Sequence, residues 1–382
     1  MLQRLLRQLQ HVVTALVLLI ILLIGAELWF RNARPVRDPA VATQADVSDQ
    51  SWLVPSATQH HLMRPLSDVV SDDGLIQFRT NSLGLRGPEP SLAATDGTFR
   101  ILLLGDDTVA GAWLEEADTL SVRLQKYLAA NLDGPVEVVN AGVPGYSPVL
   151  SLLQYEQDLA RLRADVVVLH FDMSDVADES VHRGSLRMEG SRSVCIHPFL
   201  AQDNGKKNRL LSMFRESALA KAVSEQFFKF PDRGADRDRY AWTRSGAGDL
   251  RIQIRHTMDS VTRLRARTQK ANQMLLVTTA PVSWQVLAPA RNRSLSGRFG
   301  INGEQPVTDD LPFQLLSAWS RHTGVPLCTS IDVFRAVESP EKLFQTNSPR
   351  LSKDGTDLYA REMARTILAT PQAVAGRLRT VR

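Results

Sequence analysis

The 382-residue chain has only two cysteines, Cys195 and Cys328, and they lie far apart in the sequence. No CxxC pair occurs, and no group of histidines and cysteines has the spacing of a zinc site. We therefore expect no structural metal site and no cofactor. A single disulfide is open to a chain outside the cytosol, and two buried thiols are the alternative.

Aromatic residues are also scarce, at 6% of the chain, and the formal net charge is only +4. Lysines and arginines are spread along the sequence and do not cluster with aromatic residues between them. Because a nucleic-acid groove needs such clusters, we expect no nucleic-acid partner. Hydrophobic residues make up 43% of the chain, which suffices for the core of one large domain or two small ones.

One long apolar run stands near the start of the chain, HVVTALVLLIILLIGAELWF, from His11 to Phe30. Its central part carries no charge, and a helix of about 20 residues spans a hydrocarbon core. We therefore predict a short tail at residues 1–11 and a single transmembrane signal anchor at residues 12–30. A cleaved signal peptide is the alternative. Arginines flank the run on both sides, so the positive-inside rule leaves its orientation open.

Beyond this run, polar sequence gives way to alternating strand and helix patterns. Residues 31–77 have no helical or strand period, which predicts a linker. Buried strands are predicted at 99–105, 136–142, 164–171, 273–281 and 325–331. Helices are predicted at 118–132, 148–162, 248–270, 312–323 and 355–368, with a further helix at 208–230 in an insertion at about 177–246. The alternation predicts an α/β domain at residues 78–370, with a doubly wound parallel five-stranded sheet, followed by a C-terminal tail at 371–382.

Short motifs follow the predicted strands, at the sheet edge where open α/β sheets place their sites. Gly105 and Asp106 come after the first strand and precede Asp107. The segment NAGVPGYS follows the second strand and contains Gly142. After the third strand comes FDMSDVAD, and before the last helix comes FQTNSPRLSKDGTDLYA. These last two segments contain Ser174, Asp175, Asn347, Ser348 and Arg350.

Taken in this order, the motifs resemble the four blocks of the SGNH (GDSL-like) hydrolases. The segment FRTNSLGLRGPEP at 78–90 resembles the lead-in of membrane-anchored bacterial members, and the resemblance covers about residues 78–370. It implies a flavodoxin-like sheet with strand order 2-1-3-4-5. It also implies a site in which a serine attacks an acyl carbon, a histidine oriented by an aspartate takes its proton, and several donors bind the oxyanion.

This chain departs from the family at most of those site positions. Asp107 replaces the serine, Ser174 the oxyanion asparagine, Asn347 or Ser348 the aspartate, and Arg350 the histidine, while Gly142 is kept. Arginine does not deprotonate and cannot serve as a base. Loss of one oxyanion donor costs about 10²–10³ in rate, and loss of nucleophile and base together costs far more. We therefore predict that serine esterase activity is absent, and that Asp107 and Arg350 form an ion pair that closes the oxyanion site.

Few other side chains are candidates to replace the missing nucleophile and base. Thr108 reads as a first-turn helix residue, His170 as a core histidine, and His182 and His197 as solvated loop residues. Asp107 beside Asp106 or Asp175 would resemble a carboxylate nucleophile pair, although structural hydrogen bonding explains both partners.

These considerations predict a membrane-anchored, extracytoplasmic SGNH-like domain without serine esterase chemistry. It would bind a glycan or acyl-bearing ligand, or serve as an assembly part. The alternative is an active ester hydrolase or O-acyl transferase with rewired residues, using Asp107 or Thr108. A purely structural anchor is a third hypothesis.

Overall fold

The computed structural model describes residues 52–71, 74–91, 97–201, 239–243, 250–288, 310–375 and 377–378, together with Phe299 and Ile301. The predicted anchor at 12–30 and the predicted helix at 208–230 lie outside these residues. Among the helices that are described, none has the length and apolar character needed to cross a bilayer. All described residues belong to one unit, formed by residues 43–202 and 233–382.

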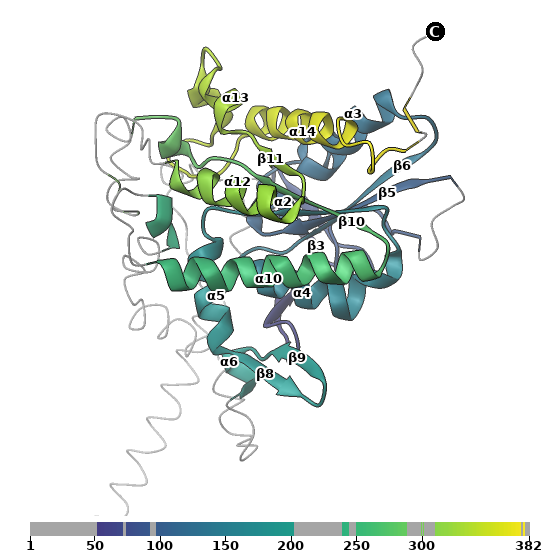
Figure 1. Cartoon of the computed structure of the whole chain (residues 1–382), viewed down its shortest axis with the longest axis vertical. Helices are drawn as coiled ribbons and strands as arrows, with labels where there is room; N and C mark the ends of the chain where they lie inside the picture. The colour runs from purple at the N-terminus through teal and green to yellow at the C-terminus, as the bar shows by residue number, and fades with distance from the viewer. Residues whose placement is uncertain are drawn as a thin grey trace, which may run out of the picture. The chain divides into compact units, whose positions relative to one another are not determined.

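Five parallel strands form the central sheet (Figure 1). In chain order they are β5 (Phe99–Gly105), β6 (Val136–Gly142), β7 (Val166–His170), β10 (Met274–Thr279) and β11 (Leu327–Thr329). Their spatial order is β6-β5-β7-β10-β11, which is the predicted order 2-1-3-4-5. The first two strands have the predicted bounds, and the other three are shorter. Every residue of β5 and β7 is buried, because helices cover both faces of the sheet. The predicted α/β fold is confirmed.

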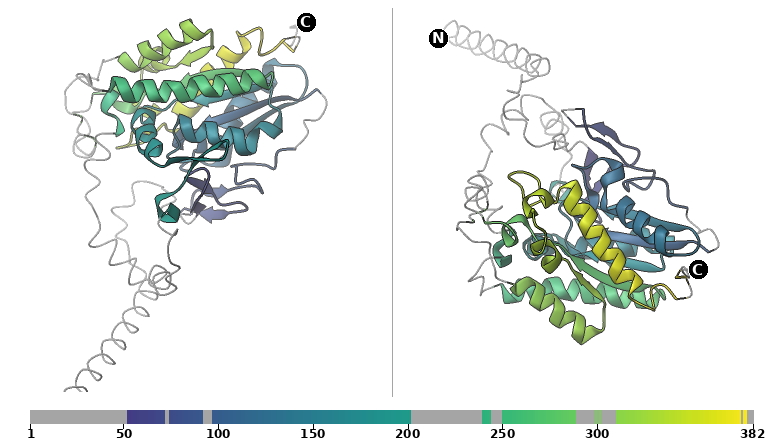
Figure 2. Two further views of the ribbon diagram at one scale, coloured as in Figure 1. Left: turned by 60° about the horizontal axis from the view of Figure 1, so that its bottom comes forward. Right: turned by 90° about the horizontal axis from the view of Figure 1, so that it is seen from above.

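Two layers of helices enclose this sheet (Figures 1 and 2). On one face α3 (Leu120–Asn131) packs against α14 (Lys353–Leu368). On the other face α10 (Arg251–Lys270) packs against α4 (Pro148–Gln154) and α5 (Asp175–Gly184). Beside α10 lies α12 (Leu311–Thr323), whose Trp319 indole donates a hydrogen bond to Thr262. The remaining helices are short: α2 (Asp107–Ala110), α6 (Pro198–Ala201), α13 (Ile331–Arg335), a π-helix at Tyr155–Leu159, and 3₁₀ turns at Glu116–Asp118, Ala160–Leu162, Ala241–Thr243, Ser283–Gln285 and Pro340–Leu343.

The prediction of a linker is wrong for residues 52–77. This segment forms β1 (Leu53–Pro55) with β2 (His61–Met63), and β3 (Asp68–Val70) with β4 (Gln77–Arg79), both as antiparallel pairs. Trp52 and Met63 are each 3% exposed and share a second, smaller core with residues that follow β6. Strands of three residues are too short to produce a period, and the buried side chains are widely spaced along the chain.

Three further features bear on the sequence-based expectations: the insertion, the cysteines and the C-terminal tail. The predicted insertion contains an antiparallel pair, β8 (Leu186–Glu189) with β9 (Arg192–Cys195). Both cysteines are buried free thiols, in agreement with the second of the two alternatives. The predicted C-terminal tail packs onto the domain, since Val374 is 1% exposed and Leu378 forms a β-bridge with Leu132.

Candidate functional site

Close packing fixes the turn between β5 and α2. A Cβ atom on Gly105 would lie 2.6 Å from a methyl group of Val109, and one on Gly142 would lie 2.4 Å from the backbone nitrogen of Ala110. Only glycine permits these approaches. Asp106 caps α2 by accepting a hydrogen bond from the Thr108 backbone N–H at 3.1 Å. Gly105, Asp106 and Gly142 are therefore explained by the close packing and capping of α2.

A buried arginine supports α2 from its other end. The Arg86 guanidinium donates to the carbonyl oxygens of Ala110, Gly111 and Leu114, with distances of 2.9 Å to Ala110 and 2.6 Å to Leu114. Arg86 is 3% exposed, and burial lowers its pKa to about 10. It belongs to the lead-in segment at 78–90. That segment therefore acts directly on the geometry of the candidate site.

Asp107 lies between two arginines at the carboxyl edge of the sheet. Its Oδ1 is 3.9 Å from Nη2 of Arg350, and its Oδ2 is 3.7 Å from Nη2 of Arg239. The Asp107 side chain is 21% exposed. Both distances exceed that of a hydrogen bond, so these are charge–charge contacts. The guanidinium of Arg350 also lies over the Trp113 ring, 4.6 Å from its centroid. The predicted Asp107–Arg350 pair is present, but it is looser than expected and is shared with a third residue.

Arg239 is that third residue, and the sequence analysis missed it. Its Nε and Nη2 atoms donate to the two carboxylate oxygens of Asp178 on α5, at 2.9–3.1 Å. This fork fixes the guanidinium next to Asp107. Arg239 comes from the predicted insertion, in the charged segment DRDRY at residues 236–240. No feature of a single sequence singles it out from its charged neighbours.

Next to Asp107 in the structure lies a group of buried carboxyl groups, Asp106, Asp172 and Asp175, whose charges affect one another. Burial, followed by the charges of Asp172 and Asp107, raises the pKa of Asp106 well above its usual value. Burial, followed by the charges of Asp106 and Asp172, also raises the pKa of Asp175. The Asp175 carboxyl group accepts a hydrogen bond from the Asp172 backbone N–H at 2.9 Å. His170 is 2% exposed and hydrogen-bonds to the Tyr359 hydroxyl at 2.8 Å. These residues hold the sheet edge together, as predicted for Asp106, Asp175 and His170.

The remaining family positions do not converge on Asp107. Ser174 is fully buried, and its backbone N–H donates to Asp172 at 2.7 Å. Asn347 is exposed with a φ of 61°, whereas Ser348 is buried and its Oγ accepts from the Arg350 backbone N–H. Among the described residues, no hydrogen bond joins Ser174 or Asn347 to Asp107. Neither position therefore supplies Asp107 with a further hydrogen bond.

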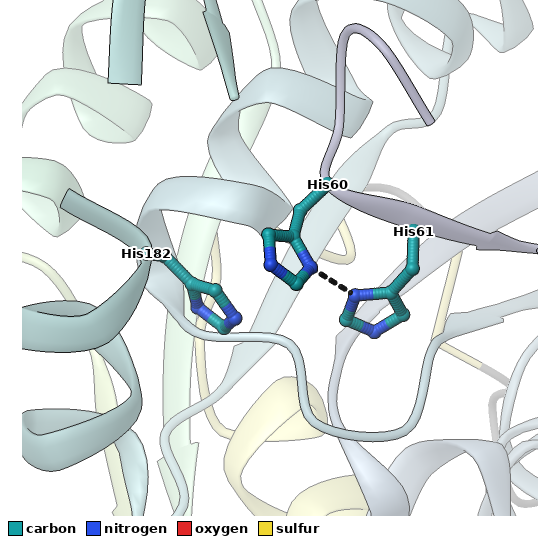
Figure 3. Close-up of side chains that lie close together, drawn as sticks. All are labelled: His60, His61 and His182. Atoms are coloured by element: carbon teal, nitrogen blue, oxygen red, sulfur yellow. Dashed lines mark hydrogen bonds between the residues drawn. The ribbon is translucent and has the colours of Figure 1, made fainter. Parts of the chain in front are cut away.

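Four of the eight histidines meet beside the loop that follows Gly142, and Figure 3 shows three of them, His60, His61 and His182. His60 and His61 approach each other with their Nδ1 atoms 2.8 Å apart. The ring of His60 lies 4.9 Å from that of His182 and 4.6 Å from that of His197, measured between centroids. The prediction that His182 is a solvated loop residue is wrong, since it lies in α5 and is 6% exposed.

Burial keeps this histidine group uncharged near neutral pH. Burial first, and then His61 and His197, lower the pKa of His60 to about 4. Burial, His60 and His61 lower the pKa of His182 to about 3. In the sequence, only the adjacent pair His60-His61 points to this histidine group, and it lies in the segment that was predicted to be a linker.

The chain was compared with known proteins. No family model and no curated protein matches it. Among solved structures it is similar to the lipase/acylhydrolase from Enterococcus faecalis, with 11% identity and a TM-score of 0.40 over 74% of this chain and 98% of that one. A GDSL-like lipase from Bacteroides thetaiotaomicron gives 11% identity and a TM-score of 0.35 over 71% and 88%. A catalytic mutant of an acetylxylan esterase from Geobacillus stearothermophilus gives 11% and 0.38 over 70% and 93%.

At the positions where the motif resemblance places the nucleophile and the base, the structure has the Asp107 carboxylate and an arginine that faces it, Arg350. Among the described residues, no histidine hydrogen-bonds to Asp107 or to Thr108. What the site offers instead is carboxylate oxygens next to two guanidinium groups, at a partly exposed place on the sheet edge.

Proposed function

We propose that this chain is a membrane-anchored, extracytoplasmic SGNH-like protein that binds a glycan at its degenerate site without serine esterase chemistry. The observation that carries the proposal is the Asp107 carboxylate, flanked by Arg239 at 3.7 Å and Arg350 at 3.9 Å. A carboxylate attacking an ester would give a mixed anhydride, and its charge opposes that of an oxyanion. The two arginines neutralise this charge but cannot take up a proton.

A hydroxyl-rich ligand matches these groups better than an acyl chain does. Sugar hydroxyls donate and accept hydrogen bonds, so a carboxylate and a guanidinium side by side satisfy both functions. The contacts of Asp107 with the arginines exceed hydrogen-bond length, which leaves its oxygens able to accept from a ligand. The anchor predicted at residues 12–30 would hold such a site next to glycans outside the cytoplasm.

Two measurements on the full-length chain test this proposal. The first is turnover of short acyl esters together with labelling by a fluorophosphonate, and we expect neither. The second is binding to a panel of acetylated and non-acetylated oligosaccharides by calorimetry. Asp107→Ala and Arg350→Met should weaken binding. Asp68→Ala should not, because Asp68 forms an exposed ion pair with Arg79 on β3 and β4.

The rewired hydrolase or O-acyl transferase is the competing proposal, and the same experiment separates the two. Ester turnover that is lost in Asp107→Ala and retained in Asp68→Ala would favour the enzyme and contradict the binding role. Absence of turnover together with absence of glycan binding would favour the structural anchor instead.

A further inference from the structure

Three histidine rings converge from two separate segments, beside the loop that follows β6 (Figure 3). His60 and His61 enter with the start of β2, and His182 enters with the last turn of α5. One ring nitrogen from each lies within 4.8 Å of the others. We propose that these three side chains bind a divalent transition-metal ion, zinc in the first place. This proposal does not depend on the glycan ligand proposed above.

The hydrogen bonding of His61 fixes which of its nitrogens is free to bind a metal. Its Nε2 lies 2.8 Å from the carbonyl oxygen of Pro144, which can only accept. The hydrogen of the neutral ring is therefore on Nε2, and the lone pair of Nδ1 accepts the Nδ1–H of His60, a hydrogen bond that a bound metal ion would replace. A histidine that donates one ring N–H to a backbone carbonyl and directs the other nitrogen at a neighbour has the arrangement typical of a metal ligand.

A buried chain of hydrogen bonds through Ser147 and Glu179 holds His182 in a similar manner. Its Nδ1 lies 2.9 Å from the Ser147 hydroxyl, and Ser147 also hydrogen-bonds to Glu179. The Glu179 carboxylate accepts from the Val149 backbone N–H at 2.8 Å and from Arg183 at 3.1 Å. Ser147 therefore donates to Glu179 and accepts from Nδ1–H of His182. This leaves the lone pair of His182 on Nε2, the second nitrogen of the ring.

The backbone holds His60 in an unusual conformation that directs its ring at the other two. Its φ is 62°, a region that few residues other than glycine adopt. The conformation is held by a hydrogen bond from its N–H to Cys195 at 2.6 Å and by one from the Ser56 N–H to its carbonyl at 2.8 Å. Non-glycine residues in this region are concentrated at functional sites, where the surrounding structure compensates for the strain.

The separations fit a zinc ion after small side-chain rotations. With zinc–nitrogen bonds of about 2.0–2.1 Å, tetrahedral ligands lie about 3.3 Å apart. The His60–His61 pair at 2.8 Å has to open slightly, and the other separations, all within 4.8 Å, have to adjust to this value. Imidazole ligands favour zinc, copper and nickel, whereas magnesium and calcium prefer oxygen. His197, whose ring stacks near His60, or a water molecule would supply the fourth ligand.

Titration of the full-length, tag-free chain with zinc alone tests the proposal. The protein is first treated with EDTA and dialysed, and zinc uptake is followed by calorimetry, with cobalt absorption as a probe of tetrahedral geometry. We expect one equivalent of zinc. His60→Gln, His61→Gln and His182→Gln should each weaken binding by more than about tenfold, and Ser147→Ala, one shell further out, by about tenfold.

Matched controls are His256→Gln and His322→Gln, because both histidines are exposed on the helices α10 and α12. These variants should retain the affinity of the wild type. The proposal is overturned if the wild type takes up no zinc, or if the control variants lose binding as much as the cluster variants do. If a cluster variant fails to fold, the histidine ring resonances of the wild-type chain are followed during zinc titration. Shifts of the His60, His61 and His182 resonances support the proposal, and shifts confined to the exposed histidines contradict it.

Discussion

Two groups of polar side chains flank the loop after β6, and they differ in how their bonding is satisfied. In the charged centre, formed by Asp107, Arg239 and Arg350, a negative charge meets two positive charges of the same chain. In the histidine cluster, formed by His60, His61 and His182, neutral rings bring their nitrogens close together, and the Nδ1 atoms of His60 and His61 share a hydrogen bond. The first group has its counter-ions built in, whereas the second is arranged for a cation from solution. Neutralised charge suits recognition of a neutral polar ligand, and converging imidazole nitrogens suit a metal.

Their origins in the sequence differ as well. Asp107 and Arg350 stand in motifs at strand ends, where parallel strands direct their loops to a common edge. The histidines come from the short strand β2 and from the last turn of α5, the helix that follows β7. The charged centre thus lies where the fold brings strand-end motifs together, while the histidine cluster also needs the segment at 52–77 to pack onto the domain.

The largest effect should follow from removing the shared cation of the charged centre. Arg239→Met leaves Asp178 without its two-pronged partner and Asp107 with only the more distant arginine. Because Arg239 is mostly buried, we expect a loss of about 2–4 kcal/mol in the free energy of unfolding, measured with urea. Arg79→Met, in the exposed pair with Asp68, serves as the control and should cost less than about 0.5 kcal/mol. Equal losses in the two variants would show that Arg239 does not organise the site.

Removal of metal should separate the two groups most sharply. At a free zinc concentration of about 100 times the dissociation constant, binding to the folded state adds about 2.7 kcal/mol to stability. EDTA should therefore lower the melting temperature of zinc-loaded wild type and leave that of His182→Gln unchanged. Arg350→Met should respond to EDTA as the wild type does, since it belongs to the other group. A response lost in Arg350→Met would contradict the division into two groups.

The Asp107–Arg350 contact should be worth about 1 kcal/mol or less. The two groups are 3.9 Å apart and 21% and 29% exposed, which places them between a surface pair and a buried one. Asp107→Asn, Arg350→Met and the double variant form a cycle measured by urea unfolding. The double variant should cost less than the sum of the single variants. Strict additivity would show that Arg350 is held by Trp113 and not by Asp107.

The smallest effect concerns the carboxyl group beneath the charged centre. The raised pKa of Asp106 means that the folded protein keeps a proton that the unfolded chain loses above about pH 4. The free energy of unfolding should therefore fall as pH rises from about 4 toward the folded-state pKa. Asp106→Asn keeps the cap on Thr108 and should show a shallower pH dependence, with stability at neutral pH equal to or above that of the wild type. Asp106→Ala loses the cap and about 1 kcal/mol. If the free energy of unfolding of Asp106→Asn has the same pH dependence as that of the wild type, the proton retained by the folded protein is not on Asp106.

The central sheet was predictable because long buried strands and amphipathic helices leave strong local patterns. β5 and β6 have the predicted bounds, and Leu120, Leu124 and Leu128 of α3 are buried as their spacing implies. The pairing of Asp107 with Arg350 was also predictable, since both stand in motifs that the fold brings to one edge. The strands at 52–77 were not, because three-residue strands have no measurable period.

The sequence by itself determined the five-stranded sheet, the strand order implied by its motifs, and the contact between Asp107 and Arg350. Only the tertiary structure decided that Arg239 joins them and that His60, His61 and His182 meet. The physical reason is that contacts between residues more than a hundred positions apart depend on how short loops and strands pack onto the sheet. Local periodicity carries no information about such packing, because it records which face of an element is buried but not which element covers it.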